Sequence, residues 1–306
     1  MTSKIRNIIS NKLYFAIFLA ILAALLYGFS TPISKLLLVK LSPFLLAALL
    51  YLGAGFGMLI VNILQVVFKV KKVEAKMTKQ ELPYIVGMIL LDILAPILLM
   101  VGLGLTTSAN ASLLNNFEIV ATSMIALLVF KEAIGRKMWI AIGLVFLASV
   151  LLSFEDLSAF SFSLGSLLVL GASISWGLEN NFTRKLSIKD PLLVVVIKGL
   201  GSGIGSLLIA YFTNTMISDP QFIIYALILG FFAYGLSIYF YITAQRTLGA
   251  ASTSAYYAMA PFIGVVLSWI FLGEKITLIF GIALFMMMIG TYLAFHENKN
   301  RSTGTS

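Results

Sequence analysis

Residues 13–37 read LYFAIFLAILAALLYGFSTPISKLL, with Lys35 as the one charged residue. A helix needs about 20 consecutive apolar residues to cross a bilayer, and this stretch supplies them. The basic residues Lys4, Arg6 and Lys12 precede it, a pattern that secretory signals share. The apolar run is longer than a typical signal core, and it has a counterpart in the second half of the chain. We therefore predict a helix that spans the membrane.

The rest of the chain has the same character. Its 306 residues are 60% hydrophobic and 11% charged, with a mean hydropathy of +1.03. A soluble domain is about half apolar and about a quarter charged, so lipid is the expected solvent here. The net charge of +9 does not indicate nucleic-acid binding, because the basic residues lie in short gaps between apolar runs. We predict an all-α integral membrane protein.

Apolar runs between polar breaks predict ten transmembrane helices. The shortest of them, and the weakest prediction, is the fifth. The predicted spans are 13–37, 43–68, 82–104, 106–130, 138–154, 162–185, 190–213, 221–244, 250–272 and 276–295.

The basic residues predict the orientation of these spans. With the N-terminus inside, 17 of the 21 Lys and Arg residues fall in inside segments and 3 in outside segments, and Lys198 lies within a span. Cytoplasmic loops carry such an excess of Lys and Arg. We predict a multi-pass protein of the cell membrane with both termini cytoplasmic and a disordered cytoplasmic tail at 297–306.

The two halves of the chain, 13–154 and 161–296, resemble each other. A spacing of 149 relates the first span to the sixth, and a spacing of 142 relates the fourth to the ninth. Five spans per half is an odd number, so the halves must insert in opposite orientations, as in many secondary transporters. The matching positions are Tyr27-Gly28 with Trp176-Gly177, Ser34-Lys35 with Thr183-Arg184, Ala109 with Ala251, Ser112 with Ser254, and Glu132 with Glu274.

These motifs resemble the EamA-type ten-helix permeases of the drug/metabolite transporter superfamily. The resemblance rests on the two aromatic-Gly pairs, the small residues at 108–112 and 250–255, Pro261 within the ninth span, and the helix endings Phe-Lys-Glu at 130–132 and Phe-Leu-Gly-Glu at 271–274. It covers nearly the whole chain. It implies a metabolite carrier, often an exporter, with a central cavity between two inverted five-helix repeats.

The chain departs from this pattern in the fourth span. Ile119 stands where the repeat would place the counterpart of Pro261, and Glu118 stands beside it. We therefore expect no backbone break in this span. We predict helix bends at Pro32, Pro96 and Pro261.

Four ionisable residues lie within predicted spans, where each is costly unless it faces a cavity or a partner. At 1.5 Å per residue, Asp92 and Glu118 are expected near the bilayer midplane. The same count places Glu179 and Lys198 in the cytoplasmic third.

Glu118 is the strongest candidate for a substrate or proton site. Asn115 and Thr122 recur with it at helical spacing and should share its face, with Asn116 on the adjoining face. A carboxylate among amides suits an amine or a titrating proton. The alternative is a hydrogen-bonded patch between helices.

The other candidates each keep two interpretations. Glu179 and Asn180, with Trp176 on the same face as Glu179, could contact substrate near the inner mouth, or Glu179 could form a structural ion pair with Lys198. For Asp92 the alternative is local hydrogen bonding to backbone loosened by Pro96.

The aromatic and small residues also keep two interpretations. Tyr256 and Tyr257 could line an aromatic wall or serve packing. Glycines at 53 and 57, and at 199, 201, 203 and 205, have the spacing of close helix contacts, either within one chain or in a homodimer.

No catalytic, cofactor or metal motif is present. Cysteine is absent, His296 is the single histidine, and neither a phosphate loop nor a nucleophile elbow occurs. We predict a secondary transporter for a small molecule, an amino acid, amine or drug-like compound, that works by alternating access with export as the expected direction. The alternatives are a sugar-phosphate or nucleotide-sugar exchanger and, from another class, a membrane enzyme or receptor-like protein.

Overall fold

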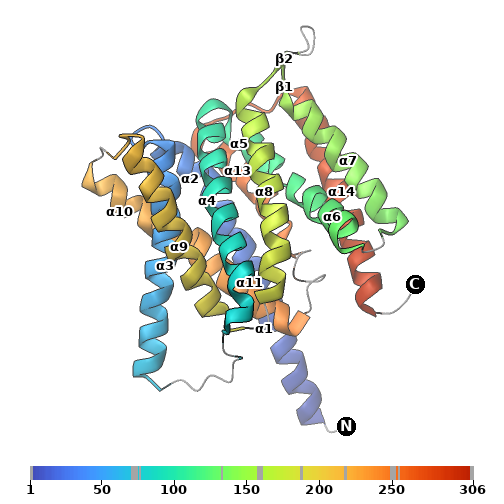
Figure 1. The fold of residues 1–306 in the computed structure, drawn as a ribbon. Coiled ribbons are helices and arrows are strands. Elements are labelled where there is room, and N and C mark those ends of the chain that lie inside the picture. Colours follow the sequence, from blue (N-terminus) through green and yellow to red (C-terminus); the bar gives the residue numbers. More distant parts are fainter. Residues whose placement is uncertain are drawn as a thin grey trace.

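A computed structural model describes residues 3–69, 75, 77–131, 134–156, 161–186, 189–216, 219–248, 253 and 256–303. Three repeat positions, Glu132, Ala251 and Ser254, lie outside these residues. The described residues form a bundle of helices with one short hairpin (Figure 1). The start of α1 and the end of α14 both lie opposite that hairpin (Figure 1).

The helices lie within or overlap the predicted spans, although the first, fourth, eighth and ninth spans are each interrupted. Each apolar run ends at a polar or proline-marked break, as the helix-end signals predict. The helices are α1 (Ser3–Gly28), α2 (Ser30–Leu37), α3 (Pro43–Val67), α4 (Leu82–Leu105), α5 (Ser108–Leu114), α6 (Phe117–Phe130), α7 (Arg136–Ser153), α8 (Leu164–Leu186), α9 (Pro191–Phe212), α10 (Pro220–Leu229), α11 (Ser237–Leu248), α13 (Ala260–Leu272) and α14 (Leu278–Thr303). A 3-10 turn η1 (Lys79–Glu81), a π-helical segment η2 (Gly230–Leu236) and the strands β1 (Phe154–Asp156) and β2 (Ser161–Phe162) complete them.

Seven helical segments of the described chain are long and apolar enough to cross a membrane. Two shorter apolar helices, Ala260–Leu272 and Leu278–Ala294, accompany them. Helix α8 is of similar length but carries the polar run at 179–181, which lowers its hydropathy. An all-helical membrane architecture is therefore confirmed, and the full set of ten spans stays a prediction.

The helices pack in matching sets. Helix α4 packs on α8 and α1 on α11, while α6 packs on α8 and α13 on α1. The pairs α3 with α9 and α7 with α14 each join equivalent helices of the two halves. Two halves related by a two-fold axis would produce this set of contacts.

The contacts of two glycines, one in each half of the chain, also correspond to each other. A Cβ on Gly28 would lie 2.6 Å from Cγ2 of Ile263, and a Cβ on Gly177 would lie 2.5 Å from Cβ of Ala121. Gly28 and Gly177 are 149 positions apart, and Ala121 and Ile263 are 142 apart. The spacings that relate the halves in the sequence thus also relate these contacts.

The glycines of α9 and α3 serve packing within one chain. A Cβ on Gly199 would lie 2.4 Å from the backbone N of Gly55, and one on Gly203 would lie 2.7 Å from the backbone N of Leu52. Gly201 and Gly205 face the α4 side chains of Ile89 and Ile93. The other predicted pair, Gly53 and Gly57, faces Leu227 and Phe231 instead of α9.

Two predicted bends differ in kind. The first span breaks at Phe29, between α1 and α2, because Pro32 has no N–H to donate to the Gly28 carbonyl. Pro96 lies inside α4, where it leaves the Asp92 carbonyl without its helical donor.

The ninth span is interrupted next to Pro261, where we predict a bend, but the expectation that this proline stands mid-helix was wrong. Residues 258–259 form a turn, and α13 begins at Ala260 with Pro261 in its first turn. A proline is tolerated there because first-turn N–H groups have no helical acceptor.

The expectation of an unbroken fourth span was also wrong. Helix α5 ends at Leu114 and α6 begins at Phe117, with a turn at Asn115-Asn116 between them. Around it the backbone bonds run three residues back, from Glu118 N to Asn115 O (3.1 Å) and from Ile119 N to Asn116 O (3.0 Å). Asparagine is a poor residue for a helix interior because its amide competes for backbone groups, which suits Asn115-Asn116 to a turn without proline. The composition alone does not decide it, because Asn180-Asn181 stay helical within α8.

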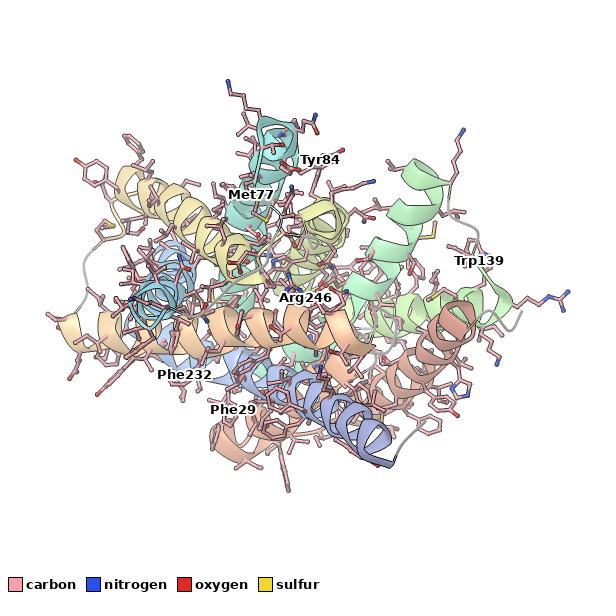
Figure 2. All side chains as sticks on the ribbon, turned by 90° about the horizontal axis from the view of Figure 1, so that it is seen from below. Phe29, Met77, Tyr84, Trp139, Phe232 and Arg246 are labelled. Atoms are coloured by element: carbon pink, nitrogen blue, oxygen red, sulfur yellow. The ribbon has the colours of Figure 1, made fainter. Side chains whose placement is uncertain are left out.

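An apolar groove opens on the lateral face between α1–α2 and α10–η2. Its volume is about 420 Å³, and Phe29 and Phe232 line it from the two sides (Figure 2). In a bilayer this face lies against lipid.

Candidate functional site

Three interrupted spans meet at the centre of the bundle. The break after Gly28, the turn at Asn115-Asn116 and the start of α13 at Ala260 all border one narrow void. Broken helices in membrane proteins are tolerated where they line a cavity, and transporter sites are built there. The void leaves no room for a water molecule in this conformation. Its lining residues are Tyr27, Gly28, Thr31, Ser112, Asn115, Ala260, Pro261 and Gly264.

Polar atoms at this void have free hydrogen-bonding capacity. Oδ1 of Asn115 and Oγ of Ser112 are buried and have no hydrogen-bond partner in the described structure. Buried polar atoms are normally paired, so each such atom requires an explanation. Two acceptors beside a closed void are suited to a ligand that carries N–H or O–H donors.

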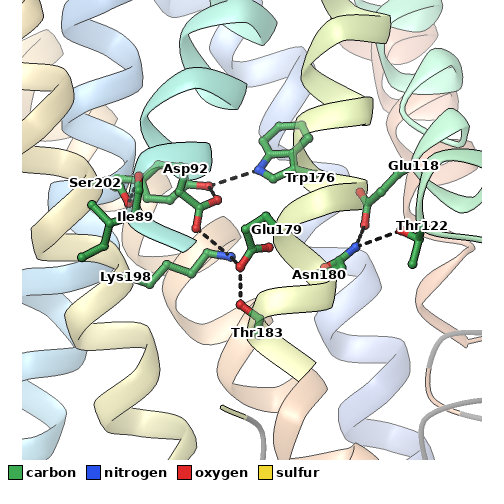
Figure 3. A network of polar contacts seen from close by, with 11 residues as sticks. Ile89, Asp92, Glu118, Thr122, Trp176, Glu179, Asn180, Thr183, Lys198 and Ser202 are labelled. Carbon is green, nitrogen blue, oxygen red and sulfur yellow. Dashed lines mark hydrogen bonds and ion pairs between the residues drawn. The ribbon is translucent and has the colours of Figure 1, made fainter. Parts of the chain in front are cut away.

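Glu118 lies between α6 and α8. Its Oε1 accepts a hydrogen bond from Nδ2 of Asn180 at 2.5 Å, and the same amide lies 3.5 Å from Oγ1 of Thr122 (Figure 3). Among the described residues, no cationic side chain pairs with Glu118. Thr122 shares its face as predicted, but the break in the span places Asn115 at the void instead.

A second acidic cluster lies on the other side of α8. Nζ of Lys198 is 3.1 Å from Oδ2 of Asp92 and 3.1 Å from Oε1 of Glu179, which also accepts a hydrogen bond from Thr183 (Figure 3). Asp92 is fully buried, and the Glu179 and Lys198 side chains are 2% and 8% exposed. We call these three residues the triad.

Tyr51 completes the surroundings of the triad. Its hydroxyl donates to Oδ1 of Asp92 at 2.8 Å and accepts from Nε1 of Trp176 at 3.3 Å. The triad joins α4 to α8 and α9, and Tyr51 adds α3. The ion pair of Glu179 with Lys198 was one predicted alternative, and the structure adds Asp92 as a third member.

The place related to the triad by the repeat is neutral. Ser30 corresponds to Glu179 by the spacing of 149, and Tyr234 corresponds to Asp92 by the spacing of 142. Oγ of Ser30 donates to the hydroxyl of Tyr234 at 3.0 Å. The positions that the two spacings relate thus hold charged groups in one case and hydroxyl groups in the other.

The remaining predicted site residues, Tyr256, Tyr257 and Asn116, lie in different parts of the bundle. The ring of Tyr257 lies 5.7 Å from that of Tyr27, beside the void. Tyr256 packs instead against α1 and α11. Asn116 turns toward α14, where its Nδ2 lies 3.9 Å from Sδ of Met287. Tyr257 thus lies next to a residue that lines the void, whereas Tyr256 and Asn116 lie against other helices.

Comparison with known proteins identifies the family. The profile of the EamA-like transporter family matches residues 14–154 and again 163–296. The chain belongs to the EamA-like transporter family. It is therefore a multi-pass integral membrane protein, and its family favours transport over catalysis.

Similar proteins carry the same broad description. An uncharacterized transporter of Methanothermobacter thermautotrophicus is 27% identical over 295 residues, which cover 91% of this chain and 85% of that protein. The uncharacterized transporter YvbV of Bacillus subtilis is 26% identical, covering 94% of this chain and 92% of that protein. A crystal structure of another protein superposes with a TM-score of 0.66 at 16% identity, over 91% of this chain and 95% of that one, which shows a shared fold.

One family motif has a visible task here. Glu274, from the Phe-Leu-Gly-Glu ending, accepts the backbone N–H groups of Ser108 and Ala109, each at 2.7 Å. A carboxylate is favourable at a helix N-terminus, so Glu274 fastens α5 to the end of α13. Nζ of Lys35 donates to the carbonyls of Leu103 and Thr106, both at 2.6 Å, and fastens α2 to the end of α4.

Proposed function

We propose that this EamA-like transporter is a secondary carrier for a small organic solute with a positively charged group, such as an amine, an amino acid or a drug-like cation. It works by alternating access in the cell membrane, with ten spans in two inverted repeats, both termini cytoplasmic, and export as the direction. The single observation that carries the substrate class is Glu118, a carboxylate inside the bundle whose described hydrogen-bond partner is the neutral amide of Asn180.

The charge around Glu118 supports a cationic ligand. An unpaired carboxylate in a membrane interior is costly, and such residues mark substrate or proton pathways. Lys198 lies on a neighbouring helix, but it already forms ion pairs with Asp92 and Glu179. A substrate ammonium group would supply the missing partner, and a proton would supply it when no substrate is bound.

The closed void supports alternating access. A carrier must hide its site from both sides during each cycle, and the void between α1–α2, α5 and α13 has no room for water. The hydrogen bonds of Glu274 to α5 and of Lys35 to the end of α4 lie at the end of the bundle that we propose is external. They would have to break for the site to open to the outside.

The exchanger alternative fits less well. A sugar phosphate or nucleotide sugar carries negative charge and needs Lys or Arg at the centre. The described centre holds three carboxylates, Asp92, Glu118 and Glu179, against one lysine, so it favours a cation.

Substitution of Glu118 tests this function. Purified protein is first screened by thermal shift against amines, amino acids and sugars, since a ligand that binds the folded state raises the melting temperature. We expect Glu118→Gln to fold with a melting temperature close to native and to lose the shift caused by the cationic ligand. In proteoliposomes the same variant should lose most of the saturable flux of that ligand.

The matched control is Thr122→Ala, which removes the other contact of Asn180 and changes no charge. It should keep the ligand-induced shift. If Glu118→Gln binds the ligand and transports it as the native protein does, Glu118 is a packing residue and the proposed substrate class is wrong.

A further inference from the structure

The triad of Asp92, Glu179 and Lys198 has an excess of one negative charge. Two carboxylates share one ammonium group, each at 3.1 Å from Nζ of Lys198. Glu118, a further acidic group, lies across α8 from the triad (Figure 3). The other polar groups around the triad are Tyr51, Trp176 and Thr183, which are uncharged and cannot offset the excess.

Burial makes this excess costly. The triad side chains are between 0% and 8% exposed, so water does not solvate them. An ion pair without full compensation in such a place costs several kcal/mol, and two carboxylates that share a site cannot both ionise readily. In the described structure, Oδ2 of Asp92 contacts Nζ of Lys198 at 3.1 Å, and a carboxylate oxygen has a second lone pair that can take a proton.

We infer that the triad is a proton-binding site, distinct from the substrate site at Glu118. One proton is shared between Asp92 and Glu179 while Lys198 stays charged, so that the bound state is neutral. No bond other than O–H forms or breaks, and the proton comes from and returns to water.

The position of the site links the proton to opening. The triad fastens α4 of the first half to α8 and α9 of the second. The related place on the other side is the neutral pair of Ser30 and Tyr234, which cannot titrate in this range. Loss of the proton would leave a buried charge that is relieved when water reaches the triad, and this would favour opening on that side alone. This role in transport, but not the proton site itself, rests on the proposed function.

The experiment counts protons and needs no substrate. Equilibrium unfolding of the purified protein in detergent micelles is measured between about pH 5 and 8, where exposed carboxyls have lost their protons. Each extra proton that the folded state holds lowers its stability as pH rises and makes the unfolding constant grow tenfold per pH unit. The triad contributes one such proton, and a protonated Glu118 would add a second that is common to the native protein and the triad variants. Proton release on unfolding, followed with a pH indicator in weak buffer, gives the same number directly.

Removing a carboxylate of the triad should lower the number of protons released on unfolding, and removing the lysine should raise it. Glu179→Gln and Asp92→Asn each leave one carboxylate with Lys198, so each should release one proton fewer than the native protein. Lys198→Met leaves two carboxylates without a cation, so it should release one more and gain stability as pH falls. Tyr234→Phe, in the neutral counterpart, should release the native number.

The opposite outcome is equally clear. If Glu179→Gln and Asp92→Asn release as many protons as the native protein, the triad is a fully ionised structural cluster and the inference is wrong. Should either single variant fail to fold, Asp92→Asn/Glu179→Gln/Lys198→Met carries no charge there, and it must also release one proton fewer. Loss of ligand binding in Glu118→Gln does not affect these counts, so the two proposals can fail separately.

Discussion

At the residue scale, Tyr51 is the residue that the sequence alone would not single out. Tyrosine is common in membrane helices, and nothing near position 51 marks it as polar machinery. In the structure it is 2% exposed and bonded to both Asp92 and Trp176. Its partners come from α4 and α8, so its role depends on contacts that no local pattern reveals.

Removing the hydroxyl of Tyr51 tests that role. Tyr51→Phe should lower the free energy of unfolding by about 1–3 kcal/mol, because it leaves a buried carboxylate oxygen and a buried indole N–H without a partner. Chemical unfolding in micelles measures the loss. Tyr257→Phe is the matched control, since its hydroxyl has a single long contact of 3.5 Å to Ser237. Equal losses in both variants would show that the Asp92 contact contributes little.

Sequence reasoning found the four buried ionisable residues because a charge in an apolar span is conspicuous. It also offered the pairing of Glu179 with Lys198, since their helices are consecutive and their depths similar. It kept Asp92 apart because the depth estimate counted backbone rise and ignored the reach of the lysine side chain. The structure places one oxygen of Asp92 and one of Glu179 each 3.1 Å from Nζ of Lys198.

At the element scale, helices α3 and α9 are held by close backbone contact. We expect Gly199→Ala to destabilise the protein by roughly 1–3 kcal/mol, the cost of overpacking, because its Cβ would lie 2.4 Å from the backbone N of Gly55. Unfolding in micelles again gives the measurement. Gly281→Ala is the control, with nothing within 4 Å of its Cβ, and should stabilise α14 by about 0.5–1 kcal/mol. A neutral Gly199→Ala would mean that the two helices separate easily.

Element boundaries were predictable where proline or a capping residue marked them. Ser42-Pro43 and Asp190-Pro191 begin α3 and α9, and each cap accepts a backbone N–H at its helix start. The π-helical segment at Gly230–Leu236 had no such mark. The break at Asn115-Asn116 was missed because we required a proline for it. Helix interruptions that arise from tertiary packing leave little trace in a single sequence.

At the scale of the whole molecule, side-chain hydrogen bonds hold the helix ends together at the end of the bundle opposite the chain termini. Glu274 bonds to the start of α5, and the charge distribution predicts that this end is external. The protein lacks cysteine, so Ser112→Cys would be its single thiol, at the closed void. We expect Glu274→Gln to speed labelling of that thiol by an impermeant reagent several-fold, because a neutral amide binds the helix N-terminus less strongly.

The neighbouring exposed charge provides the control for that measurement. Lys275→Gln should leave the labelling rate unchanged. A Glu274→Gln protein that labels no faster than its parent would show that this contact does not hold the outer end closed.

The paired packing of the helices agrees with the inverted repeat that we propose, and the sequence spacings predict it well. The asymmetry of the centre was less accessible. The spacings relate Asp92 to Tyr234 and Glu179 to Ser30. Only the structure shows that Ser30 and Tyr234 are hydrogen-bonded and that Asp92 and Glu179 share Lys198. A repeat fixes where the backbone goes, whereas side chains at equivalent places are free to diverge.

The hydrogen bond from Trp176 to Tyr51 also gives the protein an optical property. The chain has three tryptophans, and the other two, Trp139 and Trp269, are 47% and 58% exposed on the outer face of the bundle. Trp176 is 5% exposed and stands one hydroxyl away from Asp92. Brominated lipid would quench the two peripheral indoles and leave the emission of the central one, whose colour responds to the local electric field. The molecule thus carries a built-in fluorophore beside its acidic centre, readable without any label.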